Sequence, residues 1–261
     1  MRYAESRGPL AIAHRGGAGL APENTLEAFR RSYDLGVRYL ETDVRLSCDG
    51  RLVAFHDARL NRVTPARGRL RRRTLAELGG LGVLGGGPVL ALEPLLAVFP
   101  DACFTLDLKD PATIAPLAAL LRKPATAERV CVAGARGRWL RELRDLVGPQ
   151  LCTALSWRDL VRLASRPRSS YGDASFAHVP LRLGRLPVFR DDLVARAHDA
   201  GVRVVVWTVD DPETMHRLLD GGVDGIITDR PDLLREVLVA RGQWTAPDGY
   251  GASPTVSDLV S

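Results

Sequence analysis

The second half of the 261-residue chain alternates between short apolar runs and longer amphipathic segments, and this alternation restricts the fold more than any other feature. Short runs rich in β-branched residues predict strands, and the longer segments between them predict helices, several of which end at glycine. Strands that alternate with helices in this way form a parallel sheet. The predicted strands cover residues 103–108, 130–133, 151–155, 176–181, 202–209 and 225–228, and the predicted helices cover residues 111–122, 138–147, 157–164, 189–200, 212–219 and 231–240.

Two further strand–helix units lie nearer the start of the chain. An apolar run at residues 10–13 precedes a helix predicted at 25–36, and a second strand begins at residue 37. A return strand at 52–55, reached through the turn Cys48-Asp49-Gly50, is expected to pair with it as a hairpin. The total is eight βα units, so we predict the α/β class and a closed parallel (β/α)8 barrel, with an open doubly wound sheet as the alternative.

The segment Pro22-Glu23-Asn24-Thr25 comes directly before the first helix. Asn24, with Glu27 three residues later, matches a capping box, and Gly36 fits the end of the helix. This structural role is sufficient to explain the segment, so we assign it no part in catalysis.

Residues 58–91 form a long stretch rich in glycine and arginine, with one short helix predicted near 74–78. A loop of this length in a compact domain is usually functional, as a lid or a substrate wall. The basic run 67–73 (RGRLRRR) is interpreted first as a solvated loop, with a patch for an anionic partner as the alternative. We expect one barrel domain over residues 1–241, with this insertion, followed by a disordered tail at 242–261.

The composition is that of an ordinary soluble enzyme, with 46% apolar and 26% charged residues. The net charge of +5 comes almost entirely from arginine, since Lys109 and Lys123 are the only lysines, and it is weak support for a nucleic-acid partner. No apolar run is long enough for a membrane span, so we expect a cytoplasmic protein without stable membrane insertion; its oligomeric state is open. Free thiols are expected at Cys48, Cys103, Cys131 and Cys152, which show no CxxC pairing.

Charged and imidazole side chains stand at the ends of several predicted strands. His14 follows the first strand, and His56 follows the hairpin return. Glu41 and Asp43 are two residues apart, so in a strand both side chains project from one face. Two such carboxylates repel each other unless a cation lies between them or one of them is protonated.

The strand at 103–108 supplies a third carboxylate, Asp107. Carboxylate oxygens gathered at strand ends favour a hard divalent ion such as Mg²⁺ or Ca²⁺. Lys109 shares a strand face with Asp107, and its compact charge suits a crowded phosphate site better than a planar guanidinium does. The alternative is a lysine that reaches to the surface. Because chemistry in these barrels occurs at the carboxyl ends of the strands, we expect these side chains to converge.

Two histidines beside carboxylates can divide proton transfer, one imidazole accepting a proton while the other donates. His14 and His56 are the candidates. Arg15 could clamp phosphate oxygens or could form a surface ion pair. Trp207, at a strand end, is either a wall for the substrate or part of the core. His178 ends the sixth strand, and a structural role is favoured for it over a place at the mouth.

Taken together, these residues resemble the glycerophosphodiester phosphodiesterases. The resemblance runs in order over residues 11–235, nearly the whole chain. It is carried by His14-Arg15-Gly16, Pro22-Glu23-Asn24-Thr25, Glu41-x-Asp43, Asp49-Gly50, His56-Asp57, Asp107-Leu108-Lys109, Trp207-Thr208-Val209 and the segment 222–231 (GVDGIITDRP).

The resemblance implies a TIM barrel with a small insertion near the second strand. It implies a metal-dependent enzyme that hydrolyses small-molecule glycerophosphodiesters to an alcohol and sn-glycerol 3-phosphate through a cyclic phosphate. One divalent ion, Mg²⁺ or Ca²⁺ with Mn²⁺ as a further candidate, would be bound by Glu41, Asp43 and Asp107. His14 and His56 would act as acid and base, in an order left open, and Arg15 and Lys109 would contact the phosphate.

The chain departs from the family pattern at two points. The third metal position is more often glutamate, and the shorter Asp107 resembles the related sphingomyelinase D and phospholipase D-like barrels. The paired glutamates expected after the insertion appear as Leu92-Glu93-Pro94, so one is missing. A lipid-directed phosphodiesterase of the same fold, with residues 79–96 as an apolar rim, is therefore an alternative function. A non-catalytic barrel that binds a phosphate ligand is the second alternative.

Overall fold

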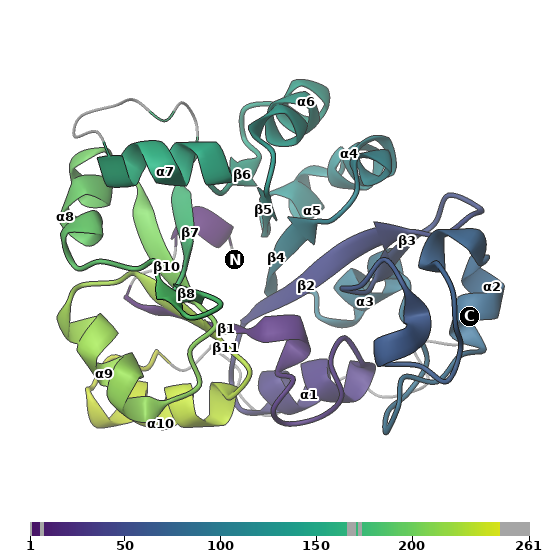
Figure 1. Cartoon of the computed structure of the whole chain (residues 1–261), viewed down its shortest axis with the longest axis horizontal. Helices are drawn as coiled ribbons and strands as arrows, with labels where there is room; N and C mark the ends of the chain where they lie inside the picture. Colours follow the sequence, from purple (N-terminus) through teal and green to yellow (C-terminus); the bar gives the residue numbers. More distant parts are fainter. Residues whose placement is uncertain (1, 6–7, 166–170, 172–173, 246–261) are drawn as a thin grey trace.

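The computed structural model describes residues 2–5, 8–165, 171 and 174–245. In this part of the chain eight parallel strands form a barrel in the order β6-β5-β4-β2-β1-β11-β10-β7 (Figure 1). A backbone bridge between Ala154, next to β6, and Phe176, the first residue of β7, brings the two ends of the sheet together. The predicted α/β class and (β/α)8 barrel are confirmed, and the open sheet is excluded.

The barrel strands lie where the sequence pattern predicts them. Their bounds are β1 (Leu10–Ala13), β2 (Tyr39–Leu46), β4 (Cys103–Leu108), β5 (Val130–Gly134), β6 (Cys152–Thr153), β7 (Phe176–Pro180), β10 (Arg203–Trp207) and β11 (Gly225–Thr228). The return strand β3 (Leu52–Ala54) pairs antiparallel with β2, as expected from the turn between them. A small hairpin of β8 (Arg182–Leu183) and β9 (Leu186–Pro187) was not predicted.

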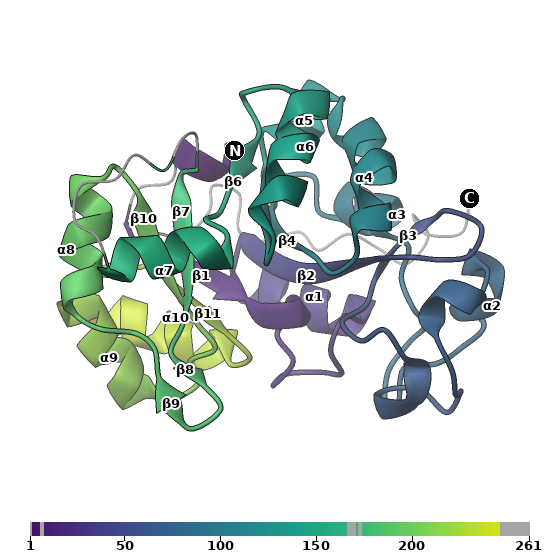
Figure 2. The same cartoon turned by 45° about the horizontal axis from the view of Figure 1, so that its top comes forward.

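Helices surround the barrel, as Figure 2 shows. Those of the described chain are α1 (Leu26–Asp34), α2 (Leu75–Gly79), α3 (Leu92–Val98), α4 (Ile114–Leu121), α5 (Pro124–Ala127), α6 (Gly137–Val147), α7 (Trp157–Ser165), α8 (Asp192–Asp199), α9 (Pro212–Asp220) and α10 (Pro231–Ala240). The short 3-10 turns are η1 (Tyr3–Glu5), η2 (His14–Gly16), η3 (Leu60–Arg62), η4 (Leu70–Arg72) and η5 (Pro111–Thr113). The sequence pattern did not predict α5 or the 3-10 turns.

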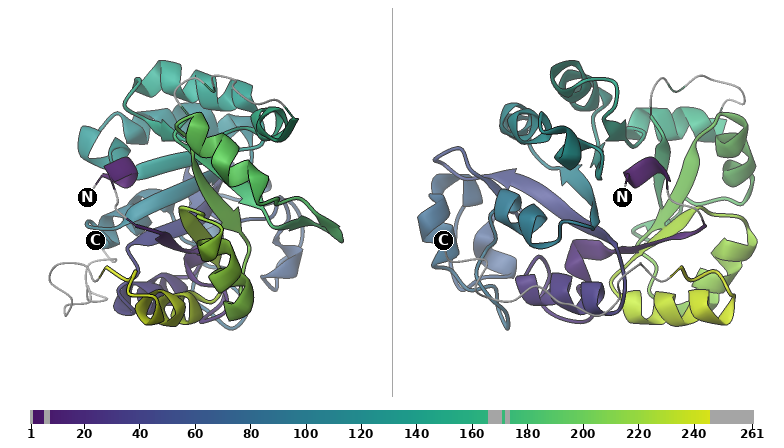
Figure 3. Two further views of the ribbon diagram at one scale, coloured as in Figure 1. Left: turned by 90° about the vertical axis from the view of Figure 1, so that its left-hand side faces the viewer. Right: turned by 180° about the vertical axis from the view of Figure 1, so that it is seen from behind.

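One end of the barrel is closed by the N-terminal turn η1, seen over the barrel from behind in Figure 3. Tyr3 is fully buried, and its hydroxyl lies 2.5 Å from the Thr105 hydroxyl inside the barrel. Its ring packs edge-on against Tyr39 at 5.2 Å and Phe176 at 5.3 Å between centroids. The interior at this end is therefore a packed core, and a ligand site belongs at the carboxyl ends of the strands.

The insertion after β3 packs around a small apolar cluster of its own. It holds the predicted short helix, α2, whose N-terminus is capped reciprocally by Thr74 and Glu77. Within residues 79–96, Leu84 is 57% exposed, whereas Val83 and Val89 are buried. The cluster consists of Val53, Phe55, Leu60, Leu70, Leu78, Val83 and Val89.

The chain after α10 remains on the barrel for several residues. The Trp244 amide donates to the Leu238 carbonyl at 3.1 Å. The Trp244 side chain packs against the two largest apolar clusters of the core. These contacts involve residues 242–245 of the predicted tail, and the predicted end of the barrel domain at residue 241 stays a prediction. The rest of that prediction, 246–261, lies outside the described residues.

All four cysteines are free, and Cys103, Cys131 and Cys152 are buried as expected, while Cys48 is exposed. In the described part of the chain, no helix combines the length and the apolar character that crossing a membrane requires.

Candidate active site

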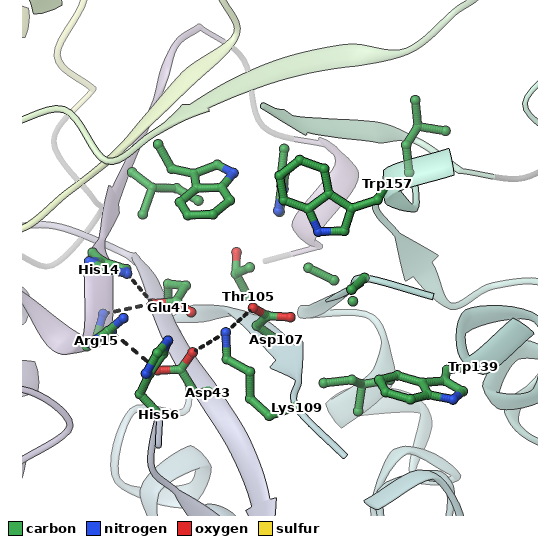
Figure 4. A pocket seen from close by; sticks show the side chains of 18 of the residues that line it. His14, Arg15, Glu41, Asp43, His56, Thr105, Asp107, Lys109, Trp139 and Trp157 are labelled. Carbon is green, nitrogen blue, oxygen red and sulfur yellow. Dashed lines mark hydrogen bonds and ion pairs between the residues drawn. The ribbon is translucent and has the colours of Figure 1, made fainter. Parts of the chain in front are cut away.

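A cavity of about 310 Å³ opens at the carboxyl ends of the barrel strands (Figure 4). The structure therefore brings together every side chain that the sequence placed in the site, although their chemical roles remain predictions. The predicted residues that line it are His14, Arg15, Glu41, Asp43, His56, Asp107, Lys109 and Trp207.

The carboxylates come from two neighbouring strands. The register of β2 and β4 pairs Asp43 with Asp107, while Glu41 lies on the same face of β2 as Asp43. Glu41 is 5% and Asp43 1% exposed. The Lys109 ammonium lies between the two strands, with Nζ 2.9 Å from Asp43 Oδ1 and 2.5 Å from Asp107 Oδ2. Lys109 is therefore a member of the site and not a lysine that reaches to the surface.

Burial and neighbouring charge shift the pKa of each acid. Burial, together with the Asp43 carboxylate, raises the pKa of Glu41 to about 7. Burial also raises the pKa of Asp107, against the opposing effect of Lys109. At Asp43 burial acts in the same sense, but Lys109 and Arg15 outweigh it and lower the pKa. The pKa values of Glu41 and Asp107 are therefore raised mainly because burial disfavours their charged forms.

The acids supply hard oxygen donors, the chemistry that Mg²⁺ and Ca²⁺ require. Within the residues that the structure describes, no three histidine, cysteine, aspartate or glutamate side chains are arranged to hold a metal ion as they stand. The Lys109 ammonium lies between Asp43 and Asp107, two of the three predicted ligands. The donor set fits a divalent ion in its chemistry, and the predicted metal site remains a prediction.

His14 occupies the turn η2, directly after β1. Its Nδ1 is 2.7 Å from Asp229 Oδ1, and its Nε2 is 3.9 Å from Glu41 Oε2. Burial lowers the pKa of His14, but Asp229 and Glu41 outweigh this effect and the pKa is raised. The next residue, Arg15, has a left-handed backbone (φ 48°) that directs its amide to Glu41 Oε2 at 2.8 Å. Such a conformation is unfavourable for a non-glycine residue and is typical of functional sites.

His56 lies on the same side of the cavity as His14 in Figure 4, with Arg15 between them. Its Nδ1 is 2.7 Å from Asp57 Oδ1. Arg62 Nε in turn donates a hydrogen bond to Asp57 Oδ2 at 2.7 Å. Burial lowers the pKa of His56, and the neighbouring Arg15 adds to this effect. The two imidazoles therefore have pKa values shifted in opposite directions, an arrangement that separates an acid from a base.

Two residues before α1 belong to the site, although the sequence suggested only a structural role for them. Glu23 accepts a hydrogen bond from Arg15 Nη1 at 3.1 Å, and the Asn24 amide donates to Asp43 Oδ2 at 3.4 Å. The capping box predicted at Asn24 is wrong. Thr25 is the N-cap and accepts from the Ala28 amide at 3.3 Å. Asn24 has a left-handed backbone (φ 57°) that turns its side chain toward the acids instead.

Sequence reasoning also missed Asp57 and Asp229, the carboxylates behind the two histidines. Asp229 directly follows β11, so the rule that places chemistry at strand carboxyl ends could have identified it. Asp57 directly follows His56 in the sequence, where a carboxylate beside a candidate imidazole was the available signal.

The wall opposite the charged groups is aromatic, as Figure 4 shows for Trp139 and Trp157. Trp207 lines the cavity and also packs on the barrel interior, so it is both wall and core. His178 lines the cavity as well, in spite of the structural role favoured for it. It is 8% exposed, its Nε2 has no hydrogen-bond partner among the described residues, and burial lowers its pKa to about 4.

The residues that the sequence connected with lipid recognition do not line the cavity. Glu93, the remaining member of the expected glutamate pair, is exposed and pairs with Lys123 Nζ at 3.1 Å. Within 79–96, Val83 and Val89 are buried in the insertion's own cluster, which leaves Leu84 as the exposed large apolar side chain of that stretch. The apolar rim that a lipid-directed enzyme needs is therefore not formed by this segment.

The fold and the site define a (β/α)8-barrel protein of the phosphodiesterase class. The profile of the glycerophosphoryl diester phosphodiesterase family matches residues 14–233, most of the chain, and the chain belongs to this family.

Individual relatives agree with this assignment. A Mycobacterium tuberculosis protein named "Probable glycerophosphodiester phosphodiesterase 2" is 37% identical over 253 residues, covering 94% of this chain and 96% of its own length. A Silicibacter pomeroyi crystal structure with the same family designation superposes with a TM-score of 0.77 at 28% identity, over 94% of this chain and 97% of that one. The fold of an Oleispira antarctica phosphodiesterase, solved with the product sn-glycerol-3-phosphate, is similar, with a TM-score of 0.75, 24% identity, and 90% and 99% coverage.

Proposed function

We propose that this protein hydrolyses small glycerophosphodiesters to an alcohol and sn-glycerol 3-phosphate. The observation that carries the proposal is the convergence of His14 and His56 on one cavity with Arg15 and Lys109. Family membership supports it, as does the name of the relative from Mycobacterium tuberculosis. The Oleispira antarctica phosphodiesterase, solved with sn-glycerol-3-phosphate, supports a product of this kind.

The proposed chemistry divides proton transfer between the two histidines. His56, with its lowered pKa, accepts the proton of the glycerol hydroxyl next to the ester as that hydroxyl attacks phosphorus. His14, with its raised pKa, donates a proton to the departing alcohol oxygen. Water then opens the cyclic phosphate with the two roles reversed. Arg15 and Lys109 stabilise the charge that develops on the phosphate oxygens.

Glu41, Asp43 and Asp107 would hold a divalent ion, which would neutralise phosphate oxygens and lower the pKa of a bound hydroxyl. Asn24 and the Arg15 amide orient two of these carboxylates through the contacts at 3.4 and 2.8 Å.

Replacing one histidine at a time tests the acid–base proposal. We expect His14→Asn and His56→Asn each to lower kcat on glycerophosphocholine by about 10²–10⁴-fold, because each variant loses a positioned acid or base. His198→Asn is the matched control, since His198 is 44% exposed on α8 and pairs with Asp224 away from the cavity. Near-normal rates in a correctly folded His14 or His56 variant would contradict the assignment.

Chelation and direct binding test the metal separately. Activity should be lost after exhaustive chelation and return with Mg²⁺, Ca²⁺ or Mn²⁺. Calorimetry should show binding of one ion that Glu41→Gln weakens, since this variant loses a carboxylate ligand. Full activity after chelation would contradict metal dependence and leave the histidine roles untouched.

The two alternative functions are distinguished by assay. Comparing water-soluble diesters with lysolipid or sphingomyelin vesicles separates the proposed activity from a lipid-directed one. Residues 79–96 do not favour the lipid-directed activity, since Leu84 is the one exposed large apolar side chain of that stretch. Binding of the diesters without turnover would indicate the phosphate-binding barrel. Residence in the cytoplasm remains a prediction that fractionation of cells would test.

A further inference from the structure

The basic run 67–73 forms part of a second concavity, which the proposed function does not use. This hollow has a volume of about 350 Å³, and four guanidinium groups line it. Of these four arginines, Arg45 comes from β2, whereas Arg59, Arg69 and Arg71 come from the insertion, directly before η3, directly before η4 and within η4. The lining residues are Arg45, Arg59, Arg69 and Arg71, with Leu46, Ala58, Leu70 and Asp110. We call this set the arginine pocket.

The fold places like charges close together in the arginine pocket. Arg59 and Arg69 are directly opposite each other in an antiparallel bridge, an arrangement that is unfavourable for two cations with no anion between them. Neither residue, nor Arg71, forms an ion pair with any acid in the described part of the chain.

Other arginines of the same insertion do find acidic partners. Arg62 pairs with Glu23 at 2.6 Å, and Arg73 with Glu77 at 3.2 Å. One acid, Asp110, also lines the pocket, and it offsets part of the positive charge of Arg45, as Asp43 does. With four arginines and one aspartate in its lining, the pocket therefore keeps an excess of positive charge.

The arginine pocket adjoins the catalytic cavity. Arg45 lies two residues after Asp43 on the same face of β2, about 7 Å along the strand. Arg45 Nε also donates to the His56 backbone carbonyl at 2.7 Å. On the other strand, Asp110 directly follows Lys109. A ligand whose phosphodiester lies at His56 and Lys109 could therefore extend into this pocket.

We propose that the arginine pocket binds a second phosphate group, carried by the alcohol half of the substrate. This inference rests on the proposed function. Guanidinium groups bind phosphate oxygens in pairs of parallel hydrogen bonds, and several of them around one hollow suit a doubly charged group. The concave shape, and a lining without an exposed large apolar side chain, favour such a discrete anion over the flat surface of a membrane. Free inorganic phosphate carries the same chemistry and is the other possible source.

Two diesters that differ by one phosphate test the proposal: glycerophosphoinositol and glycerophosphoinositol 4-phosphate. We expect the wild type to have the lower KM for the phosphorylated diester. The double variant Arg69→Gln/Arg71→Gln should raise that KM by about tenfold or more, because hydrogen bonds to charged groups are lost. It should leave kcat and the KM for glycerophosphoinositol nearly unchanged, since neither residue lines the catalytic cavity.

The matched control is Arg67→Gln/Arg72→Gln. It removes the same charge from the same run at exposed residues outside the pocket, so both KM values should stay at the wild-type level. If both double variants raised the KM for the phosphorylated diester equally, general electrostatic attraction would explain the preference for that diester. This result would overturn the proposal. An unchanged ratio of the two KM values in Arg69→Gln/Arg71→Gln would overturn it as well.

Calorimetry with inorganic phosphate separates the two sources of the anion. Phosphate binding that Arg69→Gln/Arg71→Gln abolishes, without any discrimination between the diesters, would assign the pocket to free phosphate and overturn the substrate subsite. If the wild type hydrolyses neither these diesters nor glycerophosphocholine, the proposed function fails. Direct binding of the two diesters would then still decide the arginine pocket, which requires tighter binding of the phosphorylated one.

Discussion

The charge of Asp229 should control the protonation of His14, and removing that charge is a sharp test of the proposed acid. The Asp229 carboxylate lies 2.7 Å from His14 Nδ1, and the Asp229 amide donates to Asp210 Oδ1 at 2.7 Å, which fixes the loop after β11. Asp229→Asn keeps an oxygen that can accept the same hydrogen bond and removes the negative charge. Asp229→Ala removes the oxygen as well, so it also releases the imidazole ring.

The size of the effect follows from the geometry. A hydrogen bond to a charged group contributes about 1.5–3 kcal/mol. Because the Asp229 side chain is 34% exposed, solvent screens part of this, and we take about 1.5 kcal/mol. That corresponds to about tenfold in rate. The direction is also defined: Asp229 raises the pKa of His14, so Asp229→Asn lowers it, and less His14 is protonated at a given pH.

The assay is kcat on glycerophosphocholine as a function of pH. Asp229→Asn should move the high-pH limb of the profile to lower pH, with a loss of about tenfold at pH 7.5 that becomes smaller near pH 6. Asp229→Ala should lose more at every pH. Asp232→Asn is the control, since Asp232 pairs with Arg230 and does not line the cavity. A profile of Asp229→Asn that overlays the wild type would refute the role of Asp229 and the donor role of His14.

Three further outcomes follow from the same structure. Tyr3→Ala should lower the free energy of unfolding in urea by about 3–5 kcal/mol, and Tyr3→Phe by about 1 kcal/mol, since only the first change opens a cavity at the closed end of the barrel; equal losses would contradict this. Lys109→Met should lower kcat/KM by about 10–100-fold through the lost phosphate contact, and Lys109→Arg should not restore it, because a planar fork does not replace a compact ammonium. Burial lowers the pKa of His178 from an ordinary 6.5 to about 4 in the folded protein. The unfolded chain therefore binds a proton at higher pH than the folded protein does, and the free energy of unfolding falls as the pH drops from about 6.5 to about 4. His178→Phe should remove up to about 3 kcal/mol of this pH dependence, and an unchanged dependence in urea titrations at pH 4 to 7 would refute it.

The barrel was predictable because its determinants are local. Apolar runs of strand length and glycine-terminated helices are visible over short windows, and their order is sufficient to specify eight parallel strands. The rule that chemistry lies at strand carboxyl ends then identified the acids, the histidines and Lys109. These residues line one cavity because β1, β2 and β4 are neighbours in the sheet.

The unpredicted features depend on contacts between distant parts of the chain. Nothing near Asn24 in the sequence indicates a left-handed backbone that turns its amide toward Asp43. Tyr3 closes the barrel through Thr105, 102 positions away. The position of Lys109 between two carboxylates requires the register of β2 against β4, which no single strand specifies. Local patterns therefore identified which residues gather in the cavity, and the three-dimensional packing decided how they orient one another.

The insertion after β3 packs around an apolar cluster in which Leu60 and Leu70 are fully enclosed, next in sequence to the arginines Arg59, Arg69 and Arg71 of the arginine pocket. Because those arginines lie at the surface of a separately packed unit, exchanging them would disturb the folding of the barrel very little. The selectivity for the alcohol half of the substrate and the melting temperature can then change independently in the course of evolution. A directed-evolution library confined to Arg59, Arg69 and Arg71 should yield altered selectivity at a nearly constant melting temperature.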